Sequence, residues 1–149
     1  MANADTLHSC VRTLVVDDYE PWRRQVCSML KARPELQVIA EVADGLEAVQ
    51  KAGELQPDLI LLDIGLPGLN GIEAANRIRQ VAPGTIILFL TQNSDKEMVR
   101  AALSTGAQGY VLKTDAGREL LPAVAGILDG DDFFSSGIKW DDSGDTEDT

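Results

Sequence analysis

Five polar residues of the chain follow or end short apolar runs, and their types suit phosphoryl chemistry. Asp17 and Asp18 follow "RTLVV", Asp63 follows "LILL", Thr91 follows "TIILFL", and Lys113 ends "GYVLK". Three carboxylates placed close together repel one another unless a cation joins them, and hard oxygen ligands select Mg²⁺. A hydroxyl and an ammonium beside them supply the donors and positive charge that a transferred phosphoryl group needs. We therefore predict that Asp63 is the nucleophile of this set.

Each of these residues also has a plain structural reading when it is taken alone. Asp17 and Asp18 before a helix are typical N-caps, and Asp63 suits a turn. Thr91 is a common capping residue, and Lys113 suits a solvent-exposed position. The chemical interpretation therefore depends on all five residues meeting at one place. The single histidine lies in the unpatterned N-terminal segment, so a catalytic triad that needs histidine is not expected.

Strands and helices are predicted to alternate along the chain, which would bring these residues together. Short apolar runs rich in β-branched residues predict five strands, at residues 12–16, 36–42, 59–62, 85–90 and 109–113. Apolar residues at helical spacing lie between these runs. Such strands pair in parallel through right-handed crossovers. The expected fold is an α/β, doubly wound (βα)5 sandwich around a five-stranded parallel sheet, whose ligands bind at the carboxyl ends of the strands.

Helix-start signals agree with this alternation. Pro21 suits the first turn of a helix. Asp44 with Glu47, and Ser94 with Glu97, have the spacing of capping boxes. We therefore predict that helices begin near residues 20, 45 and 95.

Length and composition indicate one acidic domain. The 149 residues are enough for one α/β core, and 24 acidic against 13 basic residues give a net charge of −11, which argues against direct nucleic-acid binding. We expect a flexible N-terminus at 1–9, a domain at 10–130, and an acidic, disordered tail or linker remnant at 131–149. The chain has neither a membrane-length apolar run nor a signal-peptide pattern, and its two cysteines form no disulfide framework. A cytoplasmic location is expected.

Four motifs in order carry a family resemblance. The combination of "VVDDYEP", "LLDIGLPGLNG", "LT" and "GYVLK" resembles the receiver domain of two-component response regulators over residues 10 to about 130. The resemblance implies a flavodoxin-like sandwich with strand order 2-1-3-4-5. It also implies a signalling switch, not a turnover enzyme on a separate substrate. Its phosphoryl group would come from a phosphohistidine on a sensor histidine kinase or a phosphotransfer protein.

The resemblance assigns the metal and the phosphorylation site. Asp63 corresponds to the phosphoacceptor of the family, and Lys113 to the lysine that pairs with the phosphoryl group. Asp17 and Asp18 correspond to the acidic pair that holds Mg²⁺ together with Asp63, with the backbone carbonyl of Gly65 as a further ligand.

The resemblance also implies how the signal leaves the site. Thr91 corresponds to the switch hydroxyl, and Tyr110 to the aromatic residue whose rotamer follows it. Tyr110 equally suits a half-buried interface position. The readout face would comprise the fourth helix, the fifth strand and the fifth helix, and the family often pairs through such faces, so a homodimer is an open expectation.

Two departures from the commonest family pattern narrow the resemblance. Gln92 follows the switch hydroxyl, where smaller residues are frequent, and its longer side chain could restrict access to the phosphorylation site. Thr114 stands where many receivers have proline, which is similar to the subgroup that precedes a LuxR/FixJ-type helix-turn-helix output domain. The 149 residues leave no room for such a domain.

Several alternatives stay open at this level. The chain could be the sensory fragment of a longer DNA-binding transcription regulator, or a pseudo-receiver that interacts without phosphate. A flavin-binding module of the same fold would need a phosphate loop rich in Ser, Thr and Gly in place of three carboxylates. Trp22 and Met29 suit core or rim packing better than ligand binding. The sequence names neither the kinase, the signal, the output nor the lifetime of the phosphoryl group.

Overall fold

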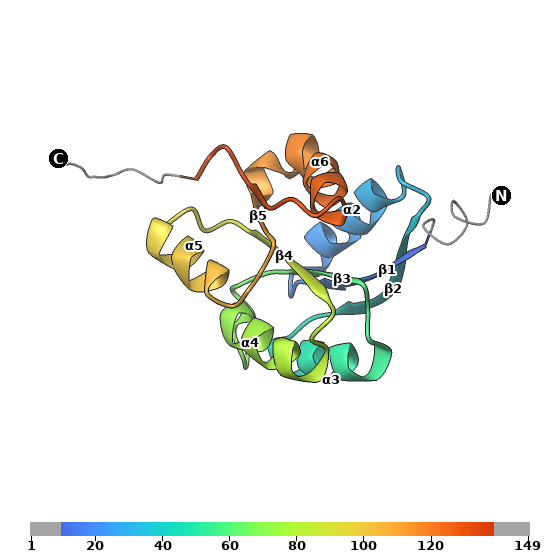
Figure 1. Ribbon diagram of the computed structural model, residues 1–149, viewed down its shortest axis with the longest axis vertical. Helices are drawn as coiled ribbons and strands as arrows, with labels where there is room; N and C mark the ends of the chain where they lie inside the picture. Colours follow the sequence, from blue (N-terminus) through green and yellow to red (C-terminus); the bar gives the residue numbers. More distant parts are fainter. Residues whose placement is uncertain (1–9, 139–149) are drawn as a thin grey trace.

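The computed structural model describes residues 10–138 as a three-layer α/β sandwich (Figure 1). Its elements, in chain order, are β1 (Val11–Val16), α2 (Glu20–Leu30), β2 (Leu36–Val42), α3 (Gly45–Leu55), β3 (Leu59–Leu62), α4 (Gly71–Val81), β4 (Ile86–Thr91), α5 (Lys96–Leu103), β5 (Gly109–Leu112), the 3₁₀ turn η1 (Lys113–Asp115), α6 (Ala116–Leu128) and β6 (Phe133–Phe134). All strand pairs are parallel, in the order β2-β1-β3-β4-β5-β6. The predicted flavodoxin-like fold and its 2-1-3-4-5 order are confirmed, and a sixth strand is added.

The sheet separates two apolar clusters, which explains why its central strands are so hydrophobic. Helices α3, α4 and α5 pack on one face, with Leu14, Ile60 and Phe89 among the buried residues there. Helices α2 and α6 pack on the other face, with Leu61 and Leu88 among the buried residues. In Figure 1, α2 and α6 lie above the sheet and α3 and α4 below it. Every residue of β3 is buried, as expected for a central strand covered on both faces.

The helix starts show which capping signals operate. Asp44 accepts a hydrogen bond from the Glu47 amide at 2.8 Å, so the predicted cap of α3 is confirmed. The predicted cap of α5 is wrong by one residue, because Asp95 and not Ser94 accepts the Glu97 amide. A carboxylate at this position also interacts favourably with the positive end of the helix dipole.

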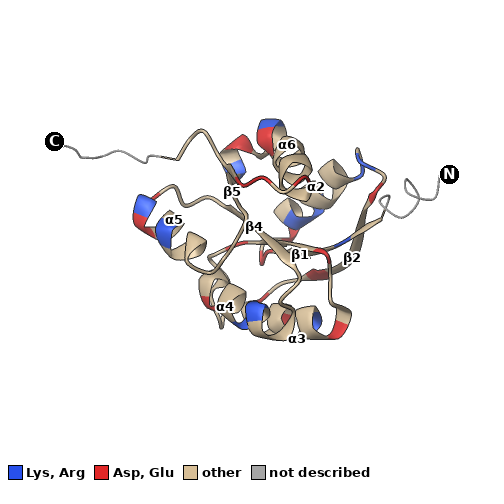
Figure 2. Cartoon of the chain, in the orientation of Figure 1, with Lys and Arg blue, Asp and Glu red and all other residues tan. Residues whose placement is uncertain are grey.

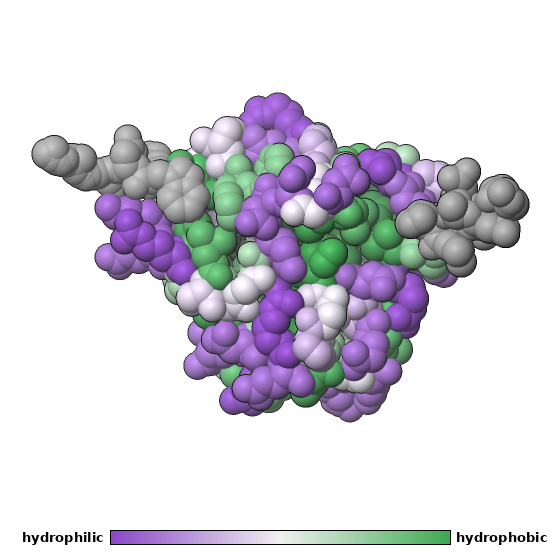
Figure 3. Space-filling model, viewed as in Figure 1, coloured by the Kyte–Doolittle hydropathy of each residue, from purple (hydrophilic) through white to green (hydrophobic). Residues whose placement is uncertain are grey.

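The surface is mixed in charge and polarity. Lys and Arg residues occur on each of the helices α2 to α6 among acidic residues (Figure 2). The face shown in Figure 3 is hydrophilic over much of the helical surface, and apolar residues gather nearer the sheet. The longest described helix, α6, has 13 residues, so no helix within residues 10–138 could span a bilayer.

The segment after α6 corrects the expected tail. Residues 131–138 were assigned to it, yet Phe133 and Phe134 form β6 beside β5, and Ile138 is buried in the cluster that contains Tyr110. The Phe133 amide donates to the Gln108 carbonyl at 3.1 Å. Apolar side chains and backbone pairing thus hold this segment on the sheet, although its first two residues are aspartates. The rest of the expected tail and the expected flexible segment 1–9 lie outside the described residues, and the boundaries at 10 and 130 stay predictions.

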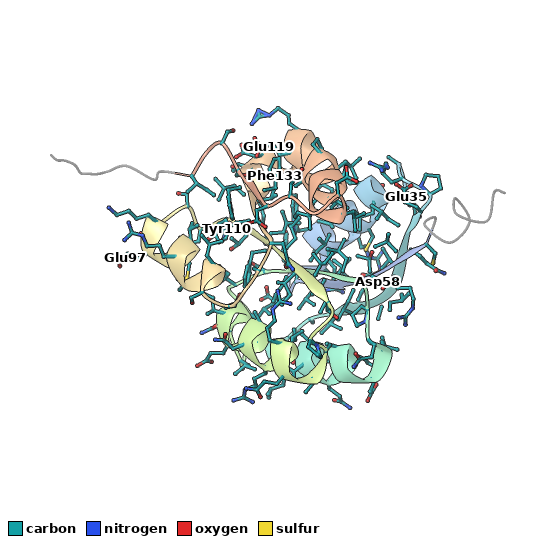
Figure 4. All side chains as sticks on the ribbon, viewed as in Figure 1. Glu35, Asp58, Glu97, Tyr110, Glu119 and Phe133 are labelled. Carbon is teal, nitrogen blue, oxygen red and sulfur yellow. The ribbon has the colours of Figure 1, made fainter. Side chains whose placement is uncertain are left out.

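Serine and glutamate side chains fix the same segment to α6. The buried Ser135 hydroxyl accepts the Leu112 amide at 2.9 Å and donates to Glu119 Oε1 at 2.6 Å, while Ser136 donates to Glu119 Oε2 at 2.8 Å. The Ser135 amide donates to the Tyr110 carbonyl at 2.8 Å. Glu119 and Phe133 accordingly lie near one another in Figure 4. The β5 edge is therefore covered by a short strand that several polar contacts hold in place.

Candidate functional site

All the predicted site residues except Asp17 and Tyr110 line a pocket of about 870 Å³ at the carboxyl ends of β1, β3, β4 and β5. Parallel strands bring their carboxyl ends to the same edge of the sheet, so residues far apart in the sequence become neighbours. The pocket is lined by Asp18, Tyr19, Trp22, Asp63, Ile64, Gly65, Asn70, Ile72, Thr91, Gln92, Asn93, Met98, Lys113 and Thr114.

Three carboxylates form a compact cluster at this site. One oxygen from each of Asp17, Asp18 and Asp63 lies within 4.8 Å of the others. Asp17 and Asp63 are 3% and 6% exposed, while Asp18 is exposed. The Tyr19 amide donates to Asp17 Oδ1 and the Ile64 amide to Asp63 Oδ1, each at 2.8 Å. These bonds orient both buried carboxylates, and a hard oxygen set open on one side suits a hydrated divalent cation.

Lys113 neutralises part of the charge in this cluster. Its Nζ lies 2.8 Å from Asp17 Oδ2 and 3.2 Å from Asp63 Oδ2. Burial raises the pKa of Asp17 above its usual value, although the hydrogen bonds from Lys113 and the Tyr19 amide act in the opposite direction. Burial acts to lower the pKa of Lys113, but its bonds to Asp17 and the two negative charges outweigh burial and raise it. Lys113 therefore keeps its positive charge beside the acidic cluster.

Glycine at the start of α4 lets the loop after β3 fold against Asp63. A Cβ at Gly71 would lie 2.0 Å from the Asp63 carbonyl oxygen, a distance that no side chain tolerates. The Gly71 amide donates to the Ile64 carbonyl at 2.7 Å, and Asn70 caps the helix through the amides of Ile72 and Glu73. The backbone around Asp63 is thus held from both sides. Gly65 lines the pocket, but the predicted role of its carbonyl as a ligand stays a prediction.

The predicted switch residues lie on the neighbouring strands β4 and β5, with Thr91 at the end of β4 and Tyr110 two positions before the end of β5. Thr91 is buried, Gln92 is exposed, and both line the pocket, while the predicted role of Gln92 in restricting access stays a prediction. Tyr110 is fully buried, and its hydroxyl donates to the Asn93 carbonyl at 2.7 Å. Figure 4 places Tyr110 between α5 and the sheet. The alternative reading of Tyr110 as half-buried is wrong, because the ring packs in the core beside Phe89.

Burial also affects the chemistry of Tyr110. Removal of the hydroxyl from water raises its pKa far above the usual value, and the negative charges of Asp63 and Asp95 act in the same direction. Tyr110 is therefore a neutral hydrogen-bond donor at any physiological pH. Its side chain bonds the loop that follows Thr91, while its carbonyl bonds Ser135.

Trp22 packs at the border of the core and the pocket, in agreement with the predicted core or rim packing. Its ring lies 5.8 Å from Lys113 Nζ and also packs against the cluster between α2 and the sheet. Met29, on the same helix, packs against that cluster without lining the pocket. One signal could have placed Trp22 near the site: it is an aromatic residue in the first turn of the helix that follows the acidic pair.

The comparisons with known proteins agree with this geometry. Residues 13–125 match the family described as the response regulator receiver domain. The chain is 35% identical over 128 residues to the transcriptional regulatory protein LiaR of Bacillus subtilis, covering 86% of this chain and 61% of LiaR. It is 36% identical over 124 residues to the response regulator protein VraR of Staphylococcus aureus, covering 83% of this chain and 59% of VraR. The chain thus spans about three fifths of the length of these relatives.

Solved structures give the same result in three dimensions. A two-component response regulator of the LuxR family from Aurantimonas sp. SI85-9A1 superposes with a TM-score of 0.82 at 36% identity, covering 87% of this chain and 92% of that one. The signal receiver domain of the response regulator NarL from Mycobacterium tuberculosis superposes with a TM-score of 0.76 at 30% identity, covering 81% of this chain and 98% of that one.

Proposed function

The chain belongs to the response regulator receiver domain family, and from this premise we propose that Asp63 accepts a phosphoryl group from a sensor histidine kinase or a phosphotransfer protein. The observation that carries the proposal is the contact of Lys113 with both Asp17 and Asp63, beside a pocket that Asp63 and Lys113 line. An oxygen of the Asp63 carboxylate attacks phosphorus, and the bond from phosphorus to the histidine nitrogen breaks. The bonding electron pair stays with the imidazole, which takes up a proton.

Mg²⁺ is the cofactor that the acidic cluster fits. The carboxylates of Asp17, Asp18 and Asp63 would hold the cation together with the Gly65 carbonyl, and all of these are hard oxygen ligands. When bound, the cation would neutralise charge on the phosphoryl oxygens. Phosphorylation adds about −1.5 to −2 charge to this cluster. Lys113 supplies a permanent positive charge and N–H donors to the same place.

The phosphoryl group is proposed to bias the packing around Tyr110. Thr91 would donate its hydroxyl to a phosphoryl oxygen, and its inward movement would give more room to the inward position of Tyr110, which the ring already occupies in this structure. Phosphorylation then favours the packing with Tyr110 inside, without a new fold. The readout face comprises α5, β5 and α6, and β6 extends it because it pairs with the outer edge of β5.

Response regulators are signalling proteins, and we propose that this receiver has no turnover activity on a separate substrate. The relatives include transcriptional regulatory proteins, which supports an output in transcription control. The chain would then be the sensory part of a DNA-binding regulator, while its own charge of −11 disfavours direct nucleic-acid contact. A homodimer through the readout face, and a cytoplasmic location consistent with the free thiols of Cys10 and Cys27, complete the proposal.

The complete set of site residues disfavours the remaining alternatives. A pseudo-receiver would not need Asp63, Lys113 and the acidic pair in contact. A flavin site would need backbone donors around a phosphate, and the carboxylates here would repel one.

Intact mass measurement tests the proposal directly. The chain is incubated with acetyl phosphate and Mg²⁺, beside Asp63→Asn and beside a sample that contains EDTA. One added phosphoryl group on the wild type, absent from both controls, is the expected result. Equal labelling of Asp63→Asn would refute the assignment of the phosphoacceptor, and equal labelling with EDTA would refute the role of the metal.

A further inference from the structure

The ammonium of Lys113 has a third neighbour besides its two carboxylates. Lysine has a flexible four-carbon stem, so its ammonium takes up a defined place only where its surroundings hold it. Two neighbours are Asp17 and Asp63, at 2.8 and 3.2 Å. The third is the indole of Trp22, with 5.8 Å between Lys113 Nζ and the ring centroid. This distance is within the range of a cation–π interaction.

The packing of Trp22 shows that its ring and not its polar atom contacts the site. The ring packs against the apolar cluster between α2 and the sheet and lines the pocket beside Lys113. Its Nε1 is buried and makes no hydrogen bond within the described residues. The indole is therefore held by apolar contacts, and what it offers to Lys113 is the electron-rich face.

We propose that Trp22 is a positioning residue that holds the Lys113 ammonium for phosphoryl transfer to Asp63, an inference that rests on the function proposed above. The interaction uses the charge of the ammonium and occupies none of the hydrogen-bond acceptors in the site. The N–H donors of Lys113 are left for Asp17, for Asp63 and for the incoming phosphoryl oxygens. Trp22 thus limits the positions of the Lys113 ammonium and does not compete for the oxygens that the ammonium must bind.

The competing explanation is that Trp22 only fills space between α2 and the sheet. Leucine keeps an apolar side chain at this position but has no aromatic face, whereas phenylalanine keeps a face. Met29 lies on the same helix and against the same cluster, but it does not line the pocket that contains Lys113. Trp22→Leu, Trp22→Phe and Met29→Ala therefore separate the aromatic contact from general loss of packing, provided that urea unfolding shows all three folded.

The first measurement is the rate of phosphoryl incorporation from acetyl phosphate with Mg²⁺, in wild-type and Lys113→Gln backgrounds. A cation–π interaction at a partly buried site corresponds to a rate loss of about three- to tenfold for Trp22→Leu. Trp22→Phe should recover most of this loss, and Met29→Ala should label at the wild-type rate. In the Lys113→Gln background, Trp22→Leu should cause no further loss. An equal loss in both backgrounds, or wild-type labelling by Trp22→Leu, would overturn the proposal.

The second measurement reports the contact without phosphorylation. The side-chain protons of Lys113 near the indole face should have upfield NMR shifts in the wild type. These shifts should be lost in Trp22→Leu, partly kept in Trp22→Phe and unchanged in Met29→Ala. Unshifted Lys113 protons in the wild type would refute the positioning contact even if the chain is phosphorylated. A wild-type chain with shifted protons that takes no label would instead refute the proposed function, and the positioning role with it.

Discussion

Ser135→Ala should be strongly destabilising although the position lies beyond the part of the chain that matches the receiver family. The Ser135 hydroxyl is buried between β5 and α6, where it accepts from the Leu112 amide and donates to Glu119. Alanine keeps the backbone bond from Ser135 to Tyr110 but removes both side-chain bonds. The substitution therefore tests whether the segment after α6 is an integral part of the fold.

The hydrogen bonds of Ser135 give the expected loss in the free energy of unfolding. A buried amide without a partner, here that of Leu112, costs about 1–3 kcal/mol, and loss of a hydrogen bond to a charged group costs about 1.5–3 kcal/mol. Glu119 keeps its bond from Ser136 and is partly accessible to water, which favours the lower end of the second range. We expect a loss of about 2–4 kcal/mol in the free energy of unfolding. Ser136→Ala, which removes one bond at an exposed position, should cost less than about 1 kcal/mol.

Urea unfolding at pH 7 followed by circular dichroism measures this difference, and the midpoint of Ser135→Ala should fall by on the order of 1–2 M. Burial acts to raise the pKa of Glu119, but the bonds from Ser135 and Ser136 outweigh burial and lower it. A lowered pKa stabilises the fold above the unfolded pKa, near 4.3 for Glu, and this contribution is lost as the pH falls through the folded value. The gap between wild type and Ser135→Ala should therefore narrow below about pH 4. A midpoint equal to that of Ser136→Ala would refute the reasoning.

Three further changes test other parts of the structure. Gly71→Ala should destabilise the chain by more than about 2 kcal/mol in urea and slow phosphorylation, because its Cβ would overlap the Asp63 carbonyl; wild-type values for both would contradict the close approach. Tyr110→Phe should lose about 1 kcal/mol of stability with its hydroxyl bond to the β4–α5 loop, and an unchanged thermal midpoint would speak against that bond. Burial, and to a smaller extent the negative charge of Glu41, raises the pKa of Cys27 to about 11. In a Cys10→Ser chain, the iodoacetamide reaction rate should therefore still rise tenfold per pH unit at pH 9, and a plateau below that pH would exclude the shift.

The acidic cluster was predictable because parallel strands bring their carboxyl ends to the same edge of the sheet, so polar residues that follow successive strands in the sequence become neighbours. The chain separates Asp17 from Asp63 by 46 residues and Asp63 from Lys113 by 50 residues. Each of the three directly follows a strand, and the carboxyl ends of parallel strands lie together, so their side chains meet. The distances between these groups were not predictable, since they depend on strand register and on the close approach at Gly71. The contact of Trp22 with Lys113 was missed because helical spacing shows which residues face the sheet but not how far along it they reach.

The position of the Tyr110 ring was beyond sequence reasoning for a similar cause. A tyrosine in a short apolar strand suits the core and an interface equally, because its ring is apolar and its hydroxyl needs a partner. The partner is the Asn93 carbonyl, which lies in a loop whose path no local signal determines. The cap of α5 was misassigned by one residue because Ser94 and Asp95 are both good caps, and tertiary packing selects between adjacent candidates.

The sixth strand was missed because its two residues carry too little pattern to indicate a strand, and two aspartates directly before it suggest solvent. The pair Phe133–Phe134 after the Gly130 turn was the available signal. Apolar residues this close together in an otherwise acidic segment suit docking on a core, and Ile138 completes that docking.

This short strand also bears on how the protein avoids aggregation through an open strand edge. Strand β5 reads "GYVL" and is buried along its whole length, so without residues 131–138 its carbonyl at Tyr110 and its amide at Leu112 would form an open, apolar edge. Such an edge is a template on which a second chain can add a strand. A fragment that ends with α6 should therefore tend to aggregate even though it keeps every residue of the phosphorylation site. In the longer chain, the two-residue β6 pairs with this edge of β5, and β6 itself is too short for a further strand to pair with it.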